Sequence, residues 1–123
     1  MCKLARELTD QVVPGKVHSN TIHVLDEPGD GNACHEYVIR VDDFTTCGII
    51  FQKGPISAEN PPNGIHGEDL LAIQIDRLRG FQSGPFACRE NEIALTHLET
   101  ALMWLQKRTR DRMARGVEGT HEK

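Results

Sequence analysis

The amino-acid sequence predicts an α+β protein in which a small N-terminal antiparallel β-sheet is followed by a two-helix hairpin with a long C-terminal helix. Short segments rich in β-branched and aromatic residues fall within residues 21–52. From residue 67 onward, hydrophobic residues recur at three- and four-residue intervals, as they do on one face of a helix. Residues 53–66, which lie between, are rich in proline and glycine and are expected to form a loop. The length of 123 residues fits one structural domain overall.

The sheet is expected to be a meander of three strands, at residues 21–26, 34–41 and 46–52. The two gaps between these strands, EPGDGNA and DDFT, consist largely of turn-forming residues and are short. Such gaps favour antiparallel neighbours. Residues 1–20, which precede the first of these strands, are expected to form an N-terminal arm.

The hairpin, residues 67–116, is expected to contain one short and one long helix. The first is predicted over residues 67–80. The segment GFQSGPF then turns the chain, and its proline, Pro85, suits the first position of a new helix. The second helix is predicted to continue to Arg115, a length of about 30 residues or about 45 Å. Gly116 is the expected stop, and residues 117–123 are expected to form a flexible tail.

The charge of the chain is distributed unevenly. The net charge is -4, although five basic residues against one acidic residue give +4 within residues 107–115 and leave -8 elsewhere. This balance disfavours DNA or RNA polymers and anionic membranes as partners but allows a focused anion site. No apolar run is long enough to span a bilayer, and the charged first twenty residues do not resemble a secretory signal. We therefore expect a cytoplasmic protein without a membrane segment.

The sequence predicts no metal site, no cofactor and no catalytic residue. Six histidines and four cysteines are present, but their spacing fits no zinc pattern. None of the common nucleophile, metalloprotease or nucleotide-binding loop motifs occurs. The protein is therefore not expected to be an enzyme. In a reducing compartment the cysteines are expected to be free thiols, namely Cys2, Cys34, Cys47 and Cys88.

Two arginines near the end of the second helix are candidates for binding phosphate. Arg108 and Arg112 are four residues apart and therefore share one helix face. Each guanidinium can donate two hydrogen bonds to phosphate oxygens and stays charged at any relevant pH. The alternative is a solvated helix end whose positive charge complements the helix dipole.

The turn of the hairpin offers residues that could hold a nucleotide base. Phe81 could stack on a base, Phe86 competes for that role, and the amide of Asn91 could read an adenine edge. The alternative is that both phenylalanines close the hairpin core. Since these residues and the two arginines lie about 25 Å or more apart along the helix, one chain cannot close the site. Two chains with antiparallel long helices could, so we expect at least a dimer.

The order of motifs GFQ-G-F-REN-AL-L-ALMWL-RTRDR resembles the helical hairpin shared by two sets of phage immune-evasion proteins. These are the Thoeris anti-defence sponges of the first type and the anti-CBASS sponges of the second type. The segments NACHEYVIRV and TCGIIFQKGP resemble the small sheet found in the Thoeris sponges, so we assign the chain to that set. The resemblance covers about residues 32 to 121.

This resemblance implies that the protein sequesters a cyclic nucleotide immune signal in the cytoplasm of the infected bacterial host without cleaving it. The implied ligand is a glycocyclic ADP-ribose isomer, and some members also hold CBASS cyclic di- or trinucleotides. Members form homodimers or hexamers of three dimers. The alternatives are an enzyme that degrades the signal and a module that docks on a host protein and binds no nucleotide. By motif, the implied ligand residues are Phe81, Asn91, Arg108 and Arg112, with Arg89 at a second cyclic-oligonucleotide site.

Overall fold

The computed structural model describes residues 6–123; the start of the expected arm, with Cys2, lies outside the described residues. Within these residues the chain divides into two compact units, and the expectation of one structural domain overall stays a prediction. The first contains the chain up to Gly54 together with Asn60–Ile65, and the second contains Pro55–Glu59 together with His66–Lys123. The expected α+β class is confirmed, with the sheet in the first unit and the helices in the second.

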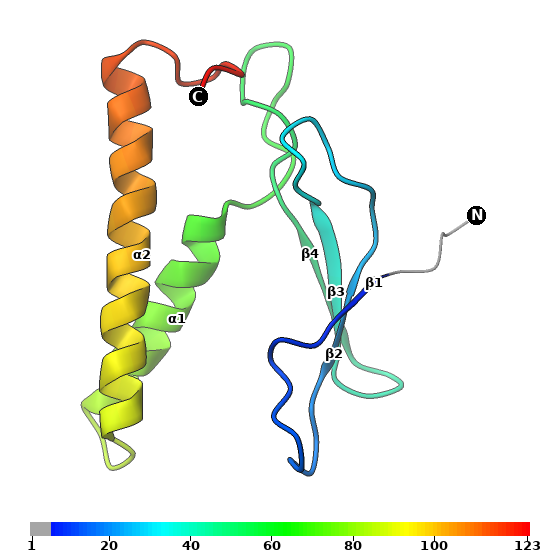
Figure 1. Ribbon diagram of the computed structural model, residues 1–123, viewed down its shortest axis with the longest axis vertical. Helices are drawn as coiled ribbons and strands as arrows, with labels where there is room; N and C mark the ends of the chain where they lie inside the picture. Colours follow the sequence, from blue (N-terminus) through cyan, green and yellow to red (C-terminus); the bar gives the residue numbers. More distant parts are fainter. Residues whose placement is uncertain (1–5) are drawn as a thin grey trace. The chain divides into compact units, whose positions relative to one another are not determined.

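The first unit contains a four-stranded antiparallel sheet in the order β1-β2-β3-β4 (Figure 1). β2 and β3 pair with Ile22 opposite Ile39, and β3 and β4 pair with Tyr37 opposite Ile49. The three predicted strands are present but shorter than predicted. A further strand, β1, lies within the segment expected to be an arm and pairs with β2. The strand bounds are Arg6–Leu8 for β1, Thr21–Val24 for β2, Glu36–Arg40 for β3 and Thr46–Ile50 for β4.

Two aspartates hold the connections of this meander. The Asp42 carboxylate accepts the backbone N–H groups of Phe44 at 2.8 Å and Thr45 at 2.7 Å, which fixes the turn from β3 to β4. Asp26 accepts the backbone N–H groups of His35 and Glu36, at 2.9 and 3.0 Å, and so fixes the approach to β3. The connections before and after β3 are therefore each fixed by an aspartate carboxylate that accepts backbone N–H groups.

The second unit is a helical hairpin, with α1 at Gly67–Gln82 and α2 at Arg89–Ala114. The Asp69 carboxylate accepts the backbone N–H of His66 at 2.9 Å, an arrangement that caps the start of α1. The predicted start of the second helix at Pro85 is wrong, because Pro85 lies in the turn and α2 begins four residues later. With 26 residues, α2 is about 39 Å long.

Few hydrophobic side chains are buried in either unit. Among the described residues only Val24 in the sheet and Ile75 in α1 are buried apolar side chains, each 3% exposed. The hairpin instead leaves several large apolar side chains exposed to solvent. No helix within residues 6–123 is long and apolar enough to cross a membrane. The exposed apolar side chains of the hairpin include Ile73, Phe86, Met103, Trp104, Leu105 and Met113.

Candidate anion-binding site

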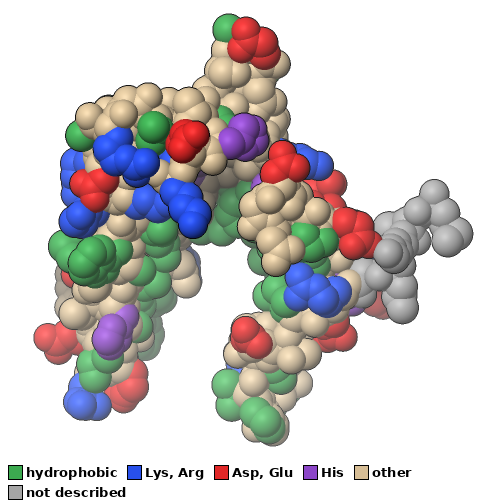
Figure 2. Space-filling view, turned by 45° about the horizontal axis from the view of Figure 1, so that its top comes forward, with side chains coloured by type: hydrophobic (Ala, Val, Ile, Leu, Met, Phe, Trp, Pro, Cys, Tyr) green, Lys and Arg blue, Asp and Glu red, His purple; other side chains and the backbone are tan. Residues whose placement is uncertain are grey.

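The C-terminal part of α2 is the most basic part of the hairpin. Figure 2 shows Lys and Arg side chains gathered on the surface toward the upper left, where this end of α2 lies. Beside them is a cavity of about 280 Å³. Arg108 and Arg112 both line it, so the structure brings together the two arginines that the sequence singled out. The lining residues are Trp104, Lys107, Arg108, Asp111, Arg112, Arg115 and Lys123.

Arg108 is exposed, and no described residue forms a hydrogen bond or ion pair with its guanidinium. The neighbouring Lys107 and Asp111 pair with each other at 2.6 Å, one helical turn apart. That pair is net neutral, so Asp111 does not take up the charge of Arg108. All the hydrogen-bond donors of Arg108 remain available to an anion.

Arg112, in contrast to Arg108, is buried, with only 5% of its surface exposed. Its Nε donates to Glu118 Oε1 at 3.1 Å, and its Nη2 donates to the backbone oxygens of Val117 and Thr120, both at 2.9 Å. Its Nη1 is buried and has no partner. The segment expected to be a flexible tail therefore folds back on this side chain. Sequence reasoning missed Glu118, which gives no signal of its own beyond its place after Gly116.

Phe81 lines a separate cavity of about 390 Å³ near the turn of the hairpin. Neither phenylalanine closes the hairpin core, since Phe81 is 38% and Phe86 is 73% exposed. The Arg77 guanidinium lies 5.6 Å from the centre of the Phe81 ring, within the range of a cation–π contact. One ring of this turn is therefore accessible and held beside a cation. The cavity is lined by Asp76, Arg77, Gly80, Phe81, Gly84, Pro85 and Phe86.

Asn91 and Arg89 both lie in the first turn of α2. Asn91 is half-buried and Arg89 is exposed, and neither is among the residues that line the Phe81 cavity. Within one chain, Asn91, the residue predicted to read a base edge, therefore lies near the turn of the hairpin but does not line the cavity that contains Phe81. The Phe81 cavity and the arginine cavity share no lining residue.

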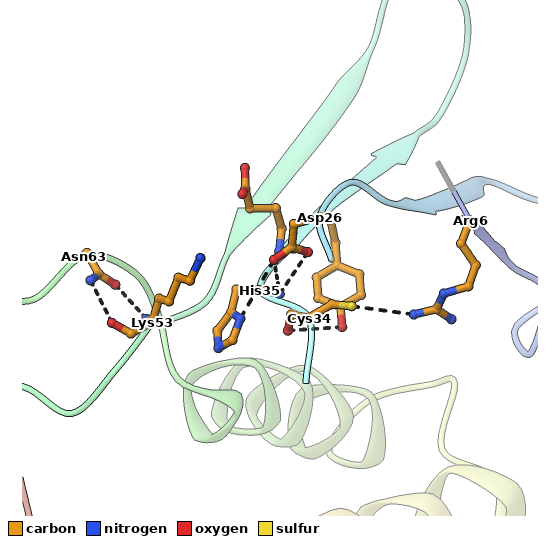
Figure 3. Close-up of polar contacts among 8 residues, drawn as sticks. Arg6, Asp26, Cys34, His35, Lys53 and Asn63 are labelled. Carbon is orange, nitrogen blue, oxygen red and sulfur yellow. Dashed lines mark hydrogen bonds and ion pairs between the residues drawn. The ribbon is translucent and has the colours of Figure 1, made fainter. Parts of the chain in front are cut away.

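A second polar cluster lies in the sheet unit, around Asp26 and His35 (Figure 3). The His35 Nδ1 atom is buried without a hydrogen-bond partner and lies 3.8 Å from Asp26 Oδ2. Burial raises the pKa of Asp26, but the N–H groups of Glu36 and His35 and the His35 ring outweigh it. The net pKa of Asp26 is therefore below its ordinary value. This carboxylate stays ionised and works as a structural acceptor.

The described residues contain no group of three or more histidine, cysteine or acidic side chains suited to hold a metal ion. Three of the cysteines predicted to be free thiols, Cys34, Cys47 and Cys88, are free. Cys34 Sγ lies 3.9 Å from Arg6 Nη2 in a weak contact.

The fold and the site define a small α+β protein whose helical hairpin has an accessible ring at its turn and a basic cavity at its far end. Residues 45–110, more than half of the chain, match the family model described as "Acb2/Tad1, hairpin domain". A relative from Bacillus phage SBSphiJ7, called Thoeris anti-defense 1, is 39% identical over 143 aligned residues. The alignment covers 96% of this chain and 99% of the relative.

The chain therefore belongs to the Acb2/Tad1 family, and the resemblance read from its sequence motifs is confirmed. The family match spans β4, α1 and most of α2, and includes Phe81, Asn91 and Arg108. Arg112 and the segment that folds over it lie just beyond that match.

Proposed function

We propose that this protein is a phage anti-Thoeris sponge, which binds a cyclic nucleotide signal of the host's defence and withholds it intact. The favoured ligand is a glycocyclic ADP-ribose isomer, whose pyrophosphate suits arginine donors. The proposal rests on the family membership and on the name of the phage relative. Its place of action is the cytoplasm of the infected bacterial host.

The observation that carries the proposal is the pair of arginines on one cavity. Arg108 has its full set of donors available, and Arg112 has a buried Nη1 without a partner. A guanidinium donates to phosphate oxygens in pairs of parallel hydrogen bonds, which a lysine cannot reproduce. A pyrophosphate bound here would receive donors that no described residue of the chain satisfies.

The base of the ligand is assigned to Phe81 and Asn91 of a second copy of the chain. The turn that carries Phe81 and the end of α2 that carries the arginines lie at opposite ends of the hairpin (Figure 1). Two hairpins with antiparallel long helices bring these ends together and create two equal pockets. Burial of the exposed apolar side chains of α2, Trp104 among them at 60% exposed, would stabilise that dimer. Three such dimers would form a hexamer.

Sequestration is demanding in energy, because a sponge acts by stoichiometry and must bind more tightly than the receptor that it starves. A nanomolar dissociation constant corresponds to about -12 kcal/mol. One aromatic stack contributes roughly 1 to 3 kcal/mol. A bidentate contact from Arg108 adds about 1.5 to 3 kcal/mol, Arg112 Nη1 adds a further charge-assisted hydrogen bond, and enclosure between two chains strengthens both. The two-chain pocket is therefore needed for the affinity as well as for the geometry.

The test is a calorimetric titration with glycocyclic ADP-ribose, followed by heat denaturation of the complex and assay of the released nucleotide on a Thoeris effector. Tight binding with an active nucleotide returned supports the sponge. Return of an inactive nucleotide indicates an enzyme that degrades the signal. Absence of binding, together with an apolar surface at Trp104 and Leu105 that stays exposed in the purified oligomer, indicates a module that docks on a host protein.

A second site for cyclic di- or trinucleotides is proposed at Arg89, which is exposed at the start of α2. Replacement of Arg89 by alanine should reduce binding of a cyclic trinucleotide and leave glycocyclic ADP-ribose binding unchanged. Loss of both activities would place Arg89 in the first pocket instead.

A further inference from the structure

The C-terminal segment after α2 is folded and held by the helix that precedes it. Gly116 has a φ of +73°, a left-handed conformation that favours glycine. The N–H of Gly116 binds the Met113 carbonyl at 3.1 Å, and the N–H of Val117 binds the Arg112 carbonyl at 3.0 Å. These two bonds form a Schellman turn, which directs the chain back toward the arginine cavity.

The turn continues through residues 117–120 and places three acceptors around one side chain. The N–H of Thr120 binds the Val117 carbonyl at 3.1 Å, which closes a second tight turn. A Cβ atom on Gly119, whose φ is +84°, would lie 3.3 Å from the Ile56 carbonyl oxygen, so this segment also packs closely against residues 55–59. The backbone oxygens of Val117 and Thr120 thereby face Arg112.

The three acceptors bind two of the three guanidinium nitrogens of Arg112 and leave the third without a partner. Glu118 takes Nε, and the two carbonyls take Nη2, while Nη1 remains without a partner. A desolvated guanidinium donor without an acceptor is unfavourable, so this atom has a strong preference for an incoming anion. Because Nη1 is buried, one of the flexible side chains that line the cavity must move aside when the anion enters.

We propose that the C-terminal turn is the positioning element of the anion site, and that Glu118 is a positioning residue that aims Arg112 Nη1 at the bound phosphate. This inference rests on the proposed function and deepens it. Because Arg112 has many rotamers, fixing three of its hydrogen bonds beforehand removes most of the ordering cost of binding. Glu118 itself contacts no ligand; it acts through Arg112.

The experiment measures glycocyclic ADP-ribose affinity by calorimetry in three full-length variants. Glu118→Ala removes the acceptor and should weaken binding about tenfold. Glu118→Gln keeps an oxygen acceptor without the charge and should stay within about threefold of the unmodified protein. Glu122→Ala is the matched control, because it removes the same charge from the same segment, where no described contact involves its side chain; it should leave the affinity unchanged.

A second measurement separates positioning from a general structural effect. The exchange rate of the Arg112 Nε–H proton, followed by nitrogen-15 side-chain NMR in the ligand-free protein, should be slow and should rise at least tenfold in Glu118→Ala. In an Arg112→Lys background, Glu118→Ala should cause no further loss of affinity. Unchanged affinity in Glu118→Ala, or tighter binding because Glu118 competes with the ligand, would overturn the inference while leaving the sponge intact. Failure of the unmodified protein to bind would remove both.

Discussion

Replacement of Arg108 by alanine tests the anion site without disturbing the fold. Arg108 is exposed and has no partner among residues 6–123, so its loss leaves no group of that part of the chain unpaired. The free energy of unfolding should therefore change by no more than about 0.5 kcal/mol. The melting temperature and the elution volume of the oligomer should stay as they are in the unmodified protein.

The binding affinity should fall much more than the stability. A bidentate charge-assisted contact to phosphate contributes about 1.5 to 3 kcal/mol, which corresponds to a loss of about 10- to 150-fold. Arg108→Lys keeps the charge but not the planar fork, and its affinity should lie between those of the unmodified protein and Arg108→Ala. Titration calorimetry with glycocyclic ADP-ribose at about 0.15 M salt measures all three proteins, since salt screens distant charges at that strength.

Arg110→Ala is the matched control for this prediction. It removes the same charge two residues away, and Arg110 neither lines the cavity nor pairs with a described residue. Its affinity should fall by less than about threefold, because the Debye length is about 8 Å at this salt concentration. Equal losses in Arg108→Ala and Arg110→Ala would mean that the ligand senses only net charge, and the site assignment would be refuted.

Three further predictions follow from other parts of the structure. Phe81→Ala should weaken ligand binding at least tenfold, by loss of base stacking, with the oligomer intact in gel filtration. Gly64→Ala should cost at least about 2 kcal/mol of stability in urea titrations, because a Cβ there would lie 2.4 Å from a backbone carbon of Phe51. Asp26 has a lowered pKa in the folded state, so its stabilising contribution is complete above its unfolded pKa of about 3.9 and is lost as the pH falls through the folded value. Urea titrations from pH 7 to pH 2.5 should show this loss in the unmodified protein and not in Asp26→Asn.

Control variants test the three predictions. Phe86→Ala alters a more exposed ring on the same cavity; if it loses affinity while Phe81→Ala does not, the stacking ring has been assigned wrongly. Gly48→Ala adds a Cβ in open space within β4 and should be tolerated, so equal instability of both glycine variants would contradict the steric argument. Identical acid dependence in Asp26→Asn and the unmodified protein would show that another carboxylate carries the effect.

Elements with a local residue pattern were predicted from the sequence. Elements that depend on contacts with other segments of the chain were not. β4 contains Ile49 and Ile50 after a tight turn, a pattern that is easily recognised. β1 is the three-residue segment Arg6–Leu8, which contains two charged residues and has no β-branched or aromatic residue to signal a strand; it pairs with β2. The start of α2 was misplaced because Pro85 suits a first helical turn in isolation. In the structure, the Gln82 side chain accepts the N–H of Cys88 at 3.0 Å, and the helix begins after that contact.

In the candidate site, too, the local feature could be predicted and the feature that depends on other segments could not. The spacing of Arg108 and Arg112 was enough to predict that both would line one surface, because helical periodicity fixes it. Their different states could not be predicted, since the burial of Arg112 depends on a left-handed turn at Gly116 and on where the following carbonyls then point. The pairing of the arginines with Phe81 stays a prediction, because it requires a second chain.

The path of the chain between its two units limits how the protein can be dissected. The backbone enters the second unit at residues 55–59, returns to the first at Asn60–Ile65, and crosses again at His66. A fragment beginning at residue 55 would carry Ile65 without the β4 residue that binds it, since the Ile65 N–H donates to the Ile50 carbonyl at 2.8 Å. A fragment beginning at residue 66 would lack the Ile56 carbonyl against which Gly119 packs. No single cut in the backbone therefore yields both units whole, and neither can be exchanged between relatives as one uninterrupted stretch of gene.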